Sequence, residues 1–363
     1  MTSAERVAVV GTGLIGTSVA MAATRIGCQV AGWDLDPDAL ASAAARQPMR
    51  ATDSVEDAVA GVTVVVVCAP IPSIPELVAR ALAAAPDAVV TDAGSIKEHV
   101  VSEVAARAGD RAHRFVGGHP MGGSERSGPE HASASIVDGI VWVLTPDAHT
   151  GSEFVERLEA WIERIGARPV RMPPGRHDRL VAFVSHLPQI ASTTLMALAA
   201  TEEAGEPEIL LLAAGGFRDL TRLASSNPAL WSQILLANPE AIAEAIDLYA
   251  ARLTELRDLV LRGDGEAVRA TFDEAKAARL RLAAKPQVRA GVAVLQVTVP
   301  DRPGALAELT LALADGSVNI EDLQIVHSPE GGRGIVHLTV AAASAADASR
   351  TLAARSFDPI RLA

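Results

Sequence analysis

The segment Gly118-His119-Pro120-Met121 has the residue types of a catalytic loop. Its glycine lets a ligand approach the backbone closely, because no side chain stands in the way. The proline after His119 disfavours a helix there and fixes the direction in which the imidazole projects. An imidazole can accept a proton near neutral pH, so His119 is a candidate general base at the rim of a cofactor crevice. The plainer alternative is a loop that holds a histidine by chance.

A cofactor-binding element is predicted at the start of the chain. The apolar run 7–10 is typical of a buried parallel strand, and a helix is predicted to follow to residue 26. In this strand–turn–helix order, a GxGxxG turn lets a pyrophosphate meet free N–H groups at the helix N-terminus. The predicted cofactor-binding residues of the turn are Gly11, Thr12, Gly13, Leu14, Ile15 and Gly16.

Asp34 indicates which dinucleotide the chain binds. It lies 18 residues after Gly16, near the expected place of an acidic residue that binds the ribose hydroxyls. Its charge repels a 2′-phosphate, and no Arg or Lys lies between Trp33 and Ala45 to offset it, so NAD is favoured over NADP. The alternative is that Asp34 only caps a helix that begins near Pro37.

Further apolar runs predict the rest of a parallel sheet, with strands at 29–33, 62–67, 88–91 and 140–144. Ligands of such sheets bind beyond the carboxyl ends of the strands. The residues predicted to line a nicotinamide pocket are therefore Cys68, Ala69, Pro70 and Ser95. Cys68 is interpreted as a small buried residue and not as a nucleophile. Ser95 can support catalysis, cap the following helix, or do both.

From residue 152 the apolar spacing becomes helical, and Pro173-Pro174-Gly175 predicts a domain boundary. Helices are expected from there to about Ala284. His177-Asp178 opens the first long helix, and the proline in Ser185-His186-Leu187-Pro188-Gln189 interrupts it. Each of these histidines could also be an ordinary hydrogen-bonded residue at a helix contact.

Two arginines of the helical region, Arg218 and Arg222, lie four residues apart and are expected on one helix face. The guanidinium group of Arg222 suits a bidentate contact with a substrate carboxylate. The alternative is a salt bridge, with Glu125 as a candidate partner.

Composition excludes several classes of protein. A chain of 363 residues suggests two or three domains, and its net charge of -12 argues against a nucleic-acid-binding surface. Its two cysteines, Cys28 and Cys68, show neither metal-ligand nor disulfide-scaffold spacing, so no metal site is predicted. No signal-peptide pattern and no apolar run of membrane-spanning length is present, which predicts a soluble, cytoplasmic protein without membrane contact.

The last part of the chain predicts a βαββαβ domain, with strands at 291–299, 318–326 and 334–341, a helix at 345–354 and a short final strand. Its segments Asp301-Arg302-Pro303-Gly304-Ala305-Leu306 and Asn319-Ile320 resemble an ACT regulatory domain. That resemblance implies an amino-acid effector bound at Gly304, Asn319 and Ile320. The alternative is a purely structural or dimerising module.

Taken together, the motifs resemble the prephenate/arogenate dehydrogenase family of tyrosine biosynthesis over nearly the whole chain. The matching segments are Gly11–Gly16, Thr91-Asp92-Ala93-Gly94-Ser95-Ile96-Lys97, Gly118-His119-Pro120-Met121, Ser124-Glu125-Arg126-Ser127-Gly128, His177-Asp178, Ser185-His186-Leu187-Pro188, Gly215-Gly216-Phe217, and Thr221-Arg222-Leu223-Ala224 with Trp231.

The resemblance implies a fold class and a domain order: an α/β Rossmann domain (1–172) that binds NAD, an all-α substrate-binding and dimerisation domain (173–286), and an α+β ferredoxin-like ACT domain (287–363). It also implies an oxidative decarboxylation in a homodimer, with prephenate or arogenate as substrate and tyrosine as feedback effector. His119 would take the proton of the ring hydroxyl while hydride passes to NAD, and carbon dioxide would leave as the ring becomes aromatic.

The same resemblance gives roles to the other candidate residues. Ser95 would hydrogen-bond near His119 and the nicotinamide, and Arg222 would hold a substrate carboxylate with Glu125 as its ion partner. The remaining substrate-binding positions are His186, Gln189, Gly215, Ser226 and Trp231.

One departure from the family pattern concerns the substrate. The family's Ser-His-Leu-Pro segment often ends in a second histidine, and here that position is Gln189. A glutamine is neutral, and its carbonyl can accept a bond from an ammonium group, so we hypothesise that arogenate is accepted at least as well as prephenate.

Two other functions remain open from the sequence. One is a hydroxyacid or imine reductase, which would use a lysine or aspartate in place of His119. The other is a non-enzymatic NAD sensor.

Overall fold

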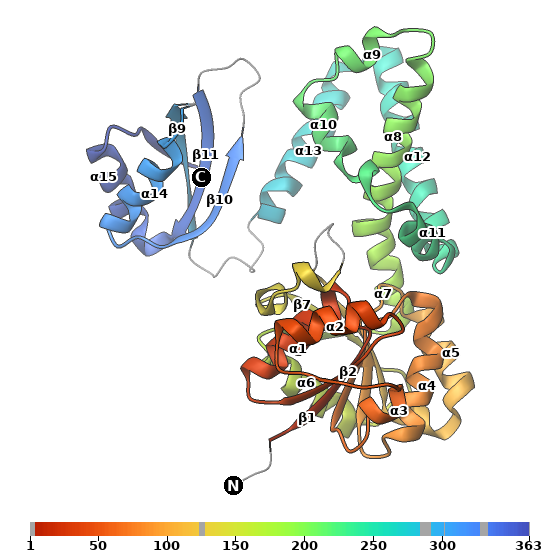
Figure 1. Cartoon of the computed structure of the whole chain (residues 1–363). Coiled ribbons are helices and arrows are strands. Elements are labelled where there is room, and N and C mark those ends of the chain that lie inside the picture. The colour runs from red at the N-terminus through yellow and green to blue at the C-terminus, as the bar shows by residue number, and fades with distance from the viewer. Residues whose placement is uncertain (1–3, 123–127, 284–291, 301, 327–332, 363) are drawn as a thin grey trace. The chain divides into compact units, whose positions relative to one another are not determined.

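The computed structural model describes residues 4–122, 128–283, 292–300, 302–326 and 333–362. The chain forms two compact units (Figure 1). The first consists of Met1–Leu210 and Leu220–Arg252, and the second of Leu211–Asp219 and Leu253–Ala363.

The first unit is built on an eight-stranded sheet with the order β3-β2-β1-β4-β5-β6-β7-β8. All neighbours pair in parallel except β6 and β7, which are antiparallel. The strands are β1 (Arg6–Val10), β2 (Gln29–Trp33), β3 (Arg50–Ala51), β4 (Val64–Val67), β5 (Val89–Asp92), β6 (Phe115–Pro120), β7 (Val141–Thr145) and β8 (Arg168–Arg171).

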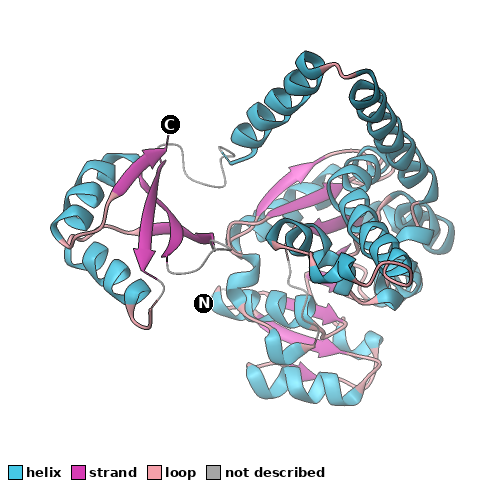
Figure 2. Ribbon diagram, turned by 90° about the horizontal axis from the view of Figure 1, so that it is seen from above, coloured by secondary structure: helices cyan, strands magenta, loops and turns pink. Residues whose placement is uncertain are grey.

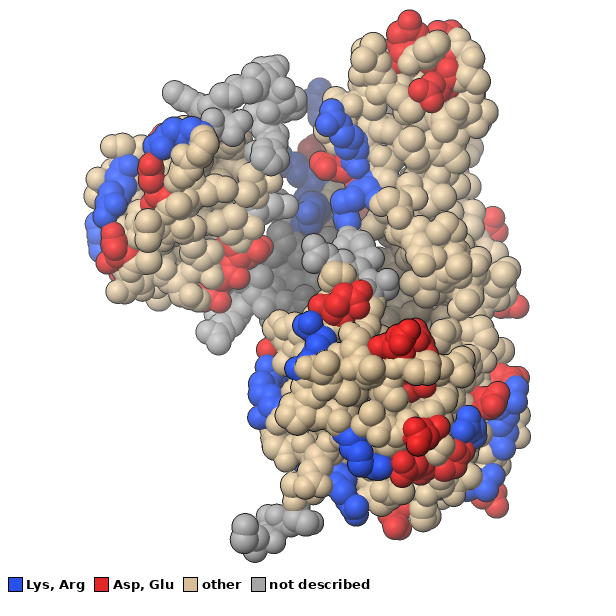
Figure 3. All heavy atoms as spheres, in the orientation of Figure 1, with Lys and Arg blue, Asp and Glu red and all other residues tan. Residues whose placement is uncertain are grey.

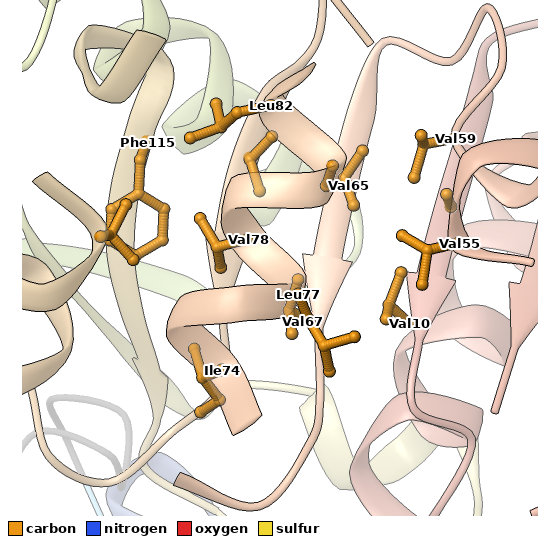
Figure 4. Packing of buried hydrophobic residues seen from close by; sticks show 14 of the residues in the cluster. Val10, Val55, Val59, Val65, Val67, Ile74, Leu77, Val78, Leu82 and Phe115 are labelled. Carbon is orange, nitrogen blue, oxygen red and sulfur yellow. The ribbon is translucent and has the colours of Figure 1, made fainter. Parts of the chain in front are cut away.

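Helices cover both faces of this sheet, because alternate strand residues point to opposite sides and both sides are apolar. In β1, Ala8 and Val10 belong to one buried cluster, and Val7 and Val9 to another. Figure 4 shows the first cluster, in which α4 side chains lie over the strands. The covering helices are α1 (Leu14–Arg25), α2 (Pro37–Arg46), α3 (Val55–Ala58), α4 (Ile74–Ala84), α5 (Glu98–Ala108) and α6 (Ser152–Arg164).

The expected catalytic loop is wrong in one respect, because His119 lies within strand β6. Gly118 and His119 pair with Leu144 and Val143 of β7. Glycine is a poor strand former, so the local sequence predicts a loop, but pairing with β7 overrides that preference. The strand gives the imidazole a rigid backbone.

A continuous helical run, Pro174–Glu202, leaves the sheet region. It comprises α7 (Pro174–Val181), the π-helical turn η5 (Ala182–His186) and α8 (Leu187–Glu202), so the expected interruption lies just before Pro188. Against our expectation, this run is long and apolar enough to cross a membrane. It is the one such helix found in the described part of the chain, and length and composition alone are weak support for a span.

A later helix packs on this run. Ala182 and Leu187 form a small buried cluster with Ile242 and Ala245 of α12. The proline signals in the sequence mark two of the helix starts. The helices that follow α8 are α9 (Glu208–Leu211), α10 (Gly215–Thr221), the 3₁₀ turn η6 (Arg222–Ser225), α11 (Pro228–Leu236) and α12 (Pro239–Arg262).

The second unit contains α13 (Gly265–Ala283) and a four-stranded antiparallel sheet with the order β10-β11-β9-β12. The two helices that connect strands of this sheet, α14 and α15, lie on one of its faces (Figure 2). The βαββαβ order is therefore confirmed: β9 (Val292–Pro300), α14 (Ala305–Asp315), β10 (Ile320–Val326), β11 (Arg333–Ala341), α15 (Ala345–Ala354) and β12 (Pro359–Leu362).

Candidate functional site

The glycine turn after β1 is built for close backbone approach. Gly11 has φ +96°, and a Cβ there would lie 2.2 Å from the carbonyl oxygen of Cys68. A Cβ on Gly16 would lie 1.9 Å from the Gly11 carbonyl oxygen. These two glycines are therefore needed for the turn itself, whereas nothing lies within 4 Å of a Cβ on Gly13. The open face at Gly13 is where the pattern expects a pyrophosphate.

The residues around this turn fit a dinucleotide. No side chain caps the N-terminus of α1 and no acidic residue lies in its first turn, so N–H groups at that end suit an anion. The carboxylate of Asp34 accepts hydrogen bonds from Thr12 at its backbone N (2.5 Å) and hydroxyl (3.0 Å). The cap of α2 is Asp36, which accepts from Asp38 N, so the reading of Asp34 as a helix cap is wrong. Cys68, Ala69 and Pro70 follow β4 at the same strand ends.

Beneath His119 lies a completely buried ion pair, Lys97–Asp92. Asp92 also accepts hydrogen bonds from Gly118 N (3.0 Å) and Gly94 N (2.9 Å), and Lys97 Nζ donates to the Gly118 carbonyl (2.7 Å). A Cβ on Gly118 would lie 2.5 Å from the Asp92 carbonyl oxygen. Both peptide groups of Gly118 are thus held, and the backbone that leads into His119 is fixed.

Asp178 holds the start of α5 from a distant part of the sequence. Its carboxylate accepts from Lys97 N and Glu98 N, both at 2.8 Å. This carboxylate takes the capping role that Ser95 was expected to fill. Ser95 is half-buried and makes no hydrogen bond with His119 among the described residues. Its support of catalysis stays a prediction.

His119 is joined to the same carboxylate through a second histidine. His119 Nδ1 lies 2.8 Å from His177 Nε2, and the rings meet edge to face with centroids 5.1 Å apart. His177 Nδ1 lies 2.7 Å from Asp178 Oδ1. The imidazole of His177 is 1% exposed, so the chain His119–His177–Asp178 runs from the strand into a buried contact with α7.

Burial lowers the pKa of His119 well below its usual value. The nearby His177, Lys97 and His186 lower that pKa further. At neutral pH, His119 is therefore a neutral imidazole with a free lone pair, which is the form a general base needs.

His186 lies further along the helical run, in η5, and its ring contacts Trp231. The two rings meet edge to face with centroids 6.1 Å apart. His186 is 1% exposed, and burial is the main cause that lowers its pKa to about 4. Its Nδ1 is buried and has no hydrogen-bond partner among the described residues.

Gln189 is tied to the segment that follows α10. Its amide nitrogen donates to the Leu223 carbonyl (2.8 Å), and its amide oxygen accepts from the Ser226 hydroxyl (3.3 Å). Arg222 begins η6 within this segment, because α10 ends at Thr221. The expectation of one regular helix carrying both Arg218 and Arg222 is therefore wrong.

Other predicted residues lie in the second unit or outside the described residues. Gly215 belongs to the second unit, and Glu125 lies outside the described residues. The predicted effector residues Gly304, Asn319 and Ile320 also belong to the second unit.

In that second unit, Gly304 has φ +87° and helps to line a cavity of about 510 Å³ before α14. Asn319 donates from its amide to Glu321 at 3.1 Å.

The sequence reasoning missed Lys97 and Asp92 as parts of the site, and it gave no role to His177-Asp178. A signal was available, because Asp92 ends an apolar strand and Lys97 follows a few residues later in an uncharged segment. Charged residues in such a setting are buried only when they are paired.

Two family models match the chain. "Prephenate dehydrogenase, nucleotide-binding domain" covers residues 19–171, and "prephenate dehydrogenase, dimerization domain" covers residues 173–274. A prephenate dehydrogenase of Bacillus subtilis is 32% identical over 344 residues, which is 92% of each chain. A cyclohexadienyl dehydrogenase of Zymomonas mobilis is 33% identical and covers 80% of this chain and 100% of its own.

Solved structures give the same result. Prephenate dehydrogenase from Aquifex aeolicus in complex with hydroxyphenyl propionate and NAD⁺ has a TM-score of 0.72 at 30% identity, covering 77% of this chain and 99% of its own. Synechocystis arogenate dehydrogenase has a TM-score of 0.69 at 27% identity, covering 76% and 99%.

The ion pair beneath His119 leads to a prediction about stability. Lys97→Met leaves the Asp92 carboxylate buried without its cation, which costs about 3–5 kcal/mol of the free energy of unfolding. The double variant Lys97→Met/Asp92→Asn removes both charges and is expected to regain part of that loss. Denaturant unfolding of the three proteins measures the difference. Equal stability of the single and double variants would contradict the prediction.

Proposed function

This chain belongs to the prephenate dehydrogenase family, and we propose that His119 is the general base of its reaction. The enzyme is an NAD-dependent prephenate or arogenate dehydrogenase of tyrosine biosynthesis. The observation that carries the proposal is a neutral imidazole fixed on a rigid strand, with its Nδ1 occupied by His177. Its Nε2 is left to face a substrate hydroxyl.

NAD accepts the hydride at C4 of its nicotinamide when it is bound. We propose that the glycine turn and the N-terminus of α1 hold the pyrophosphate and that Asp34 binds the ribose hydroxyls. Cys68, Ala69, Pro70 and Ser95 follow strand ends of the same sheet, where the nicotinamide pocket of such folds lies. Loss of carbon dioxide makes the ring aromatic, so the chain's own task is to orient the substrate and take one proton.

The role of His119 is tested by His119→Asn. The amide is similar in size but cannot accept a proton, so kcat is expected to fall about 100- to 10,000-fold. NAD affinity, followed by fluorescence titration, should stay within about twofold because the glycine turn is untouched. A variant that keeps most of its kcat would refute the role of His119 as base and would favour a reductase with another acid–base group. If the wild-type protein binds NAD but turns over neither prephenate nor arogenate, the result would favour the non-enzymatic NAD sensor.

We also propose that arogenate is accepted at least as well as prephenate. Arogenate carries an amine where prephenate has a ketone, and the neutral Gln189 places no positive charge near that group. The Gln189 carbonyl keeps one lone pair after it has accepted from Ser226, and an ammonium can donate to it. Arg222, at the start of the neighbouring turn η6, is proposed to hold a substrate carboxylate.

The substrate preference is measured as the ratio of kcat/KM for arogenate to that for prephenate. We expect a ratio of at least one for the wild type. In Gln189→His the ratio should fall about tenfold, because an imidazole can carry positive charge and repel an ammonium. Thr194→Ala, an exposed change on the same helix, is the matched control. A strong wild-type preference for prephenate would overturn the proposal.

We propose the domain boundaries 1–172, 173–286 and 287–363, and a homodimer that works in the cytoplasm. Apolar side chains on the helices support a dimer, because a large exposed apolar surface marks an interaction site. Those of the first unit that are at least half exposed are Phe183, Val184, Leu198, Leu220, Leu230, Leu236 and Leu248. The face of the molecule in Figure 3 carries charges of both signs over the sheet region.

The C-terminal sheet is proposed to be an ACT domain that binds tyrosine, the pathway product. The cavity beside Gly304 supports this, because a left-handed glycine there leaves the turn open to a small ligand. Asn319 and Ile320 are proposed to contribute to the same effector site, and Glu125 to pair with Arg222 in the active site.

Deletion of residues 287–363 is expected to abolish inhibition by tyrosine and to leave turnover within a few-fold of wild type. Asn319→Ala in the full chain should weaken the inhibition without a change in the uninhibited rate. NAD reduction at increasing tyrosine concentration measures both. Inhibition that survives the deletion would place tyrosine at the active site.

A further inference from the structure

The hydrogen bonds around His177 fix the tautomers of two histidines. The carboxylate of Asp178 can only accept, so His177 Nδ1 carries the hydrogen of the 2.7 Å contact. A neutral His177 then presents a lone pair at Nε2, which accepts from His119 Nδ1 at 2.8 Å. His119 must therefore carry its lone pair on Nε2.

In this series of hydrogen bonds, the atom that takes a proton, His119 Nε2, is separate from the group that can hold the charge, the His177–Asp178 pair. His119 faces no carboxylate among the described residues, and burial lowers its pKa. His177 contacts Asp178 directly, and Asp178 is anchored by two N–H groups at the N-terminus of α5. An ionised carboxylate makes a charge-assisted hydrogen bond with an imidazole N–H, and that bond strengthens when the ring gains a proton.

The chemistry of the reaction requires the proton to come back. The substrate loses a hydride and carbon dioxide, and its ring oxygen ends as a phenol hydroxyl. With His119 as base, the hydroxyl proton leaves the oxygen during oxidation, and a proton must return once the ring is aromatic. A store for one proton meets this need, and release to solvent is not required.

We propose that His119 and His177 form a reversible proton store, in which His119 exchanges the proton with substrate and the His177–Asp178 pair holds it. This proposal rests on the role of His119 as base. The hydroxyl O–H bond breaks, and its proton forms a bond with His119 Nε2. The His119 Nδ1–H bond breaks, and that proton bonds to His177 Nε2. The electron pair left on oxygen forms the carbonyl as hydride leaves the carbon, and both proton transfers reverse after carbon dioxide has left.

His177 and Asp178 are positioning residues in this scheme, because they act through His119. The other titratable groups around the pair are Lys97, which is neutralised by Asp92 of β5, and His186 of η5. These groups are cationic or neutral, so Asp178 is the carboxylate that balances a charge on His177.

The test uses His177→Gln in the full-length enzyme. The glutamine carbonyl lies near the position of Nε2 and can accept the His119 Nδ1–H bond, but it cannot take a proton. We expect kcat to fall about 100-fold with KM for substrate and NAD within about threefold. The acidic limb of kcat/KM should move to lower pH, because the remaining base is His119, whose pKa burial lowers. His149→Gln, on an exposed loop, is the matched control and should leave both quantities unchanged.

A second readout does not depend on activity. In histidine-labelled wild-type protein, ¹⁵N NMR should show His119 with hydrogen on Nδ1 and the lone pair on Nε2. His119→Asn assigns the resonance by its loss. In His177→Leu, which removes the acceptor, His119 should shift towards the Nε2–H tautomer.

The results separate this proposal from the proposed function. Turnover that is retained in His119→Asn would refute the role of His119 as base, and with it the proposed proton store. Loss of turnover in His119→Asn together with wild-type kcat and pH profile in His177→Gln overturns the store alone. An Nε2–H tautomer of His119 in the wild type also overturns it.

Discussion

The site depends on a carboxylate and an ammonium that are completely buried beneath the strand that carries His119. Asp92 and Lys97 contact each other. Asp92 accepts a hydrogen bond from the N–H of Gly118, and Lys97 donates one to the C=O of Gly118. A buried ion pair adds little net stability, since desolvation offsets most of the attraction. What this pair contributes is geometry: two hydrogen bonds hold the peptide groups on both sides of Gly118, and the next residue is the proposed base. A glycine is required there because a side chain would collide with the Asp92 carbonyl.

A second carboxylate, that of Asp178, connects this hydrogen-bonded arrangement to the helical run. Asp178 caps α5 from α7, and Lys97, the residue before α5, therefore takes part in both arrangements. Asn238 adds a further tie, because its amide donates to the Asp178 carbonyl at 3.0 Å. His119 comes from the sheet and His177 from a helix, yet they meet at hydrogen-bond distance because both are anchored to the start of α5.

Local signals in the sequence were sufficient for much of the fold. The glycine turn, the starts of α11 and α12 at prolines and the βαββαβ order of the C-terminal sheet follow from turn chemistry and periodicity. Strand β6 could not be predicted in this way, since Gly117 and Gly118 favour a loop and only their pairing with β7 makes them a strand. The cap of α5 also escaped prediction, because Asp178 lies 81 residues from Lys97. The candidate base could be found from its motif, but the groups that orient it are defined by long-range contacts.

The contacts of Gln189 change how that position can influence specificity. Sequence reasoning treated its carbonyl as an acceptor that is free for the substrate. In the structure, the amide nitrogen is engaged by Leu223 and Thr193, and one lone pair of the oxygen by Ser226. Any residue at this position therefore acts in two ways: through the lone pair that remains, and through the placement of η6, which begins with Arg222. A change in charge at Gln189 alters the first, and a change in shape alters the second. Because the same side chain contributes to both, the contacts proposed for the ammonium and carboxylate ends of a substrate would depend on each other.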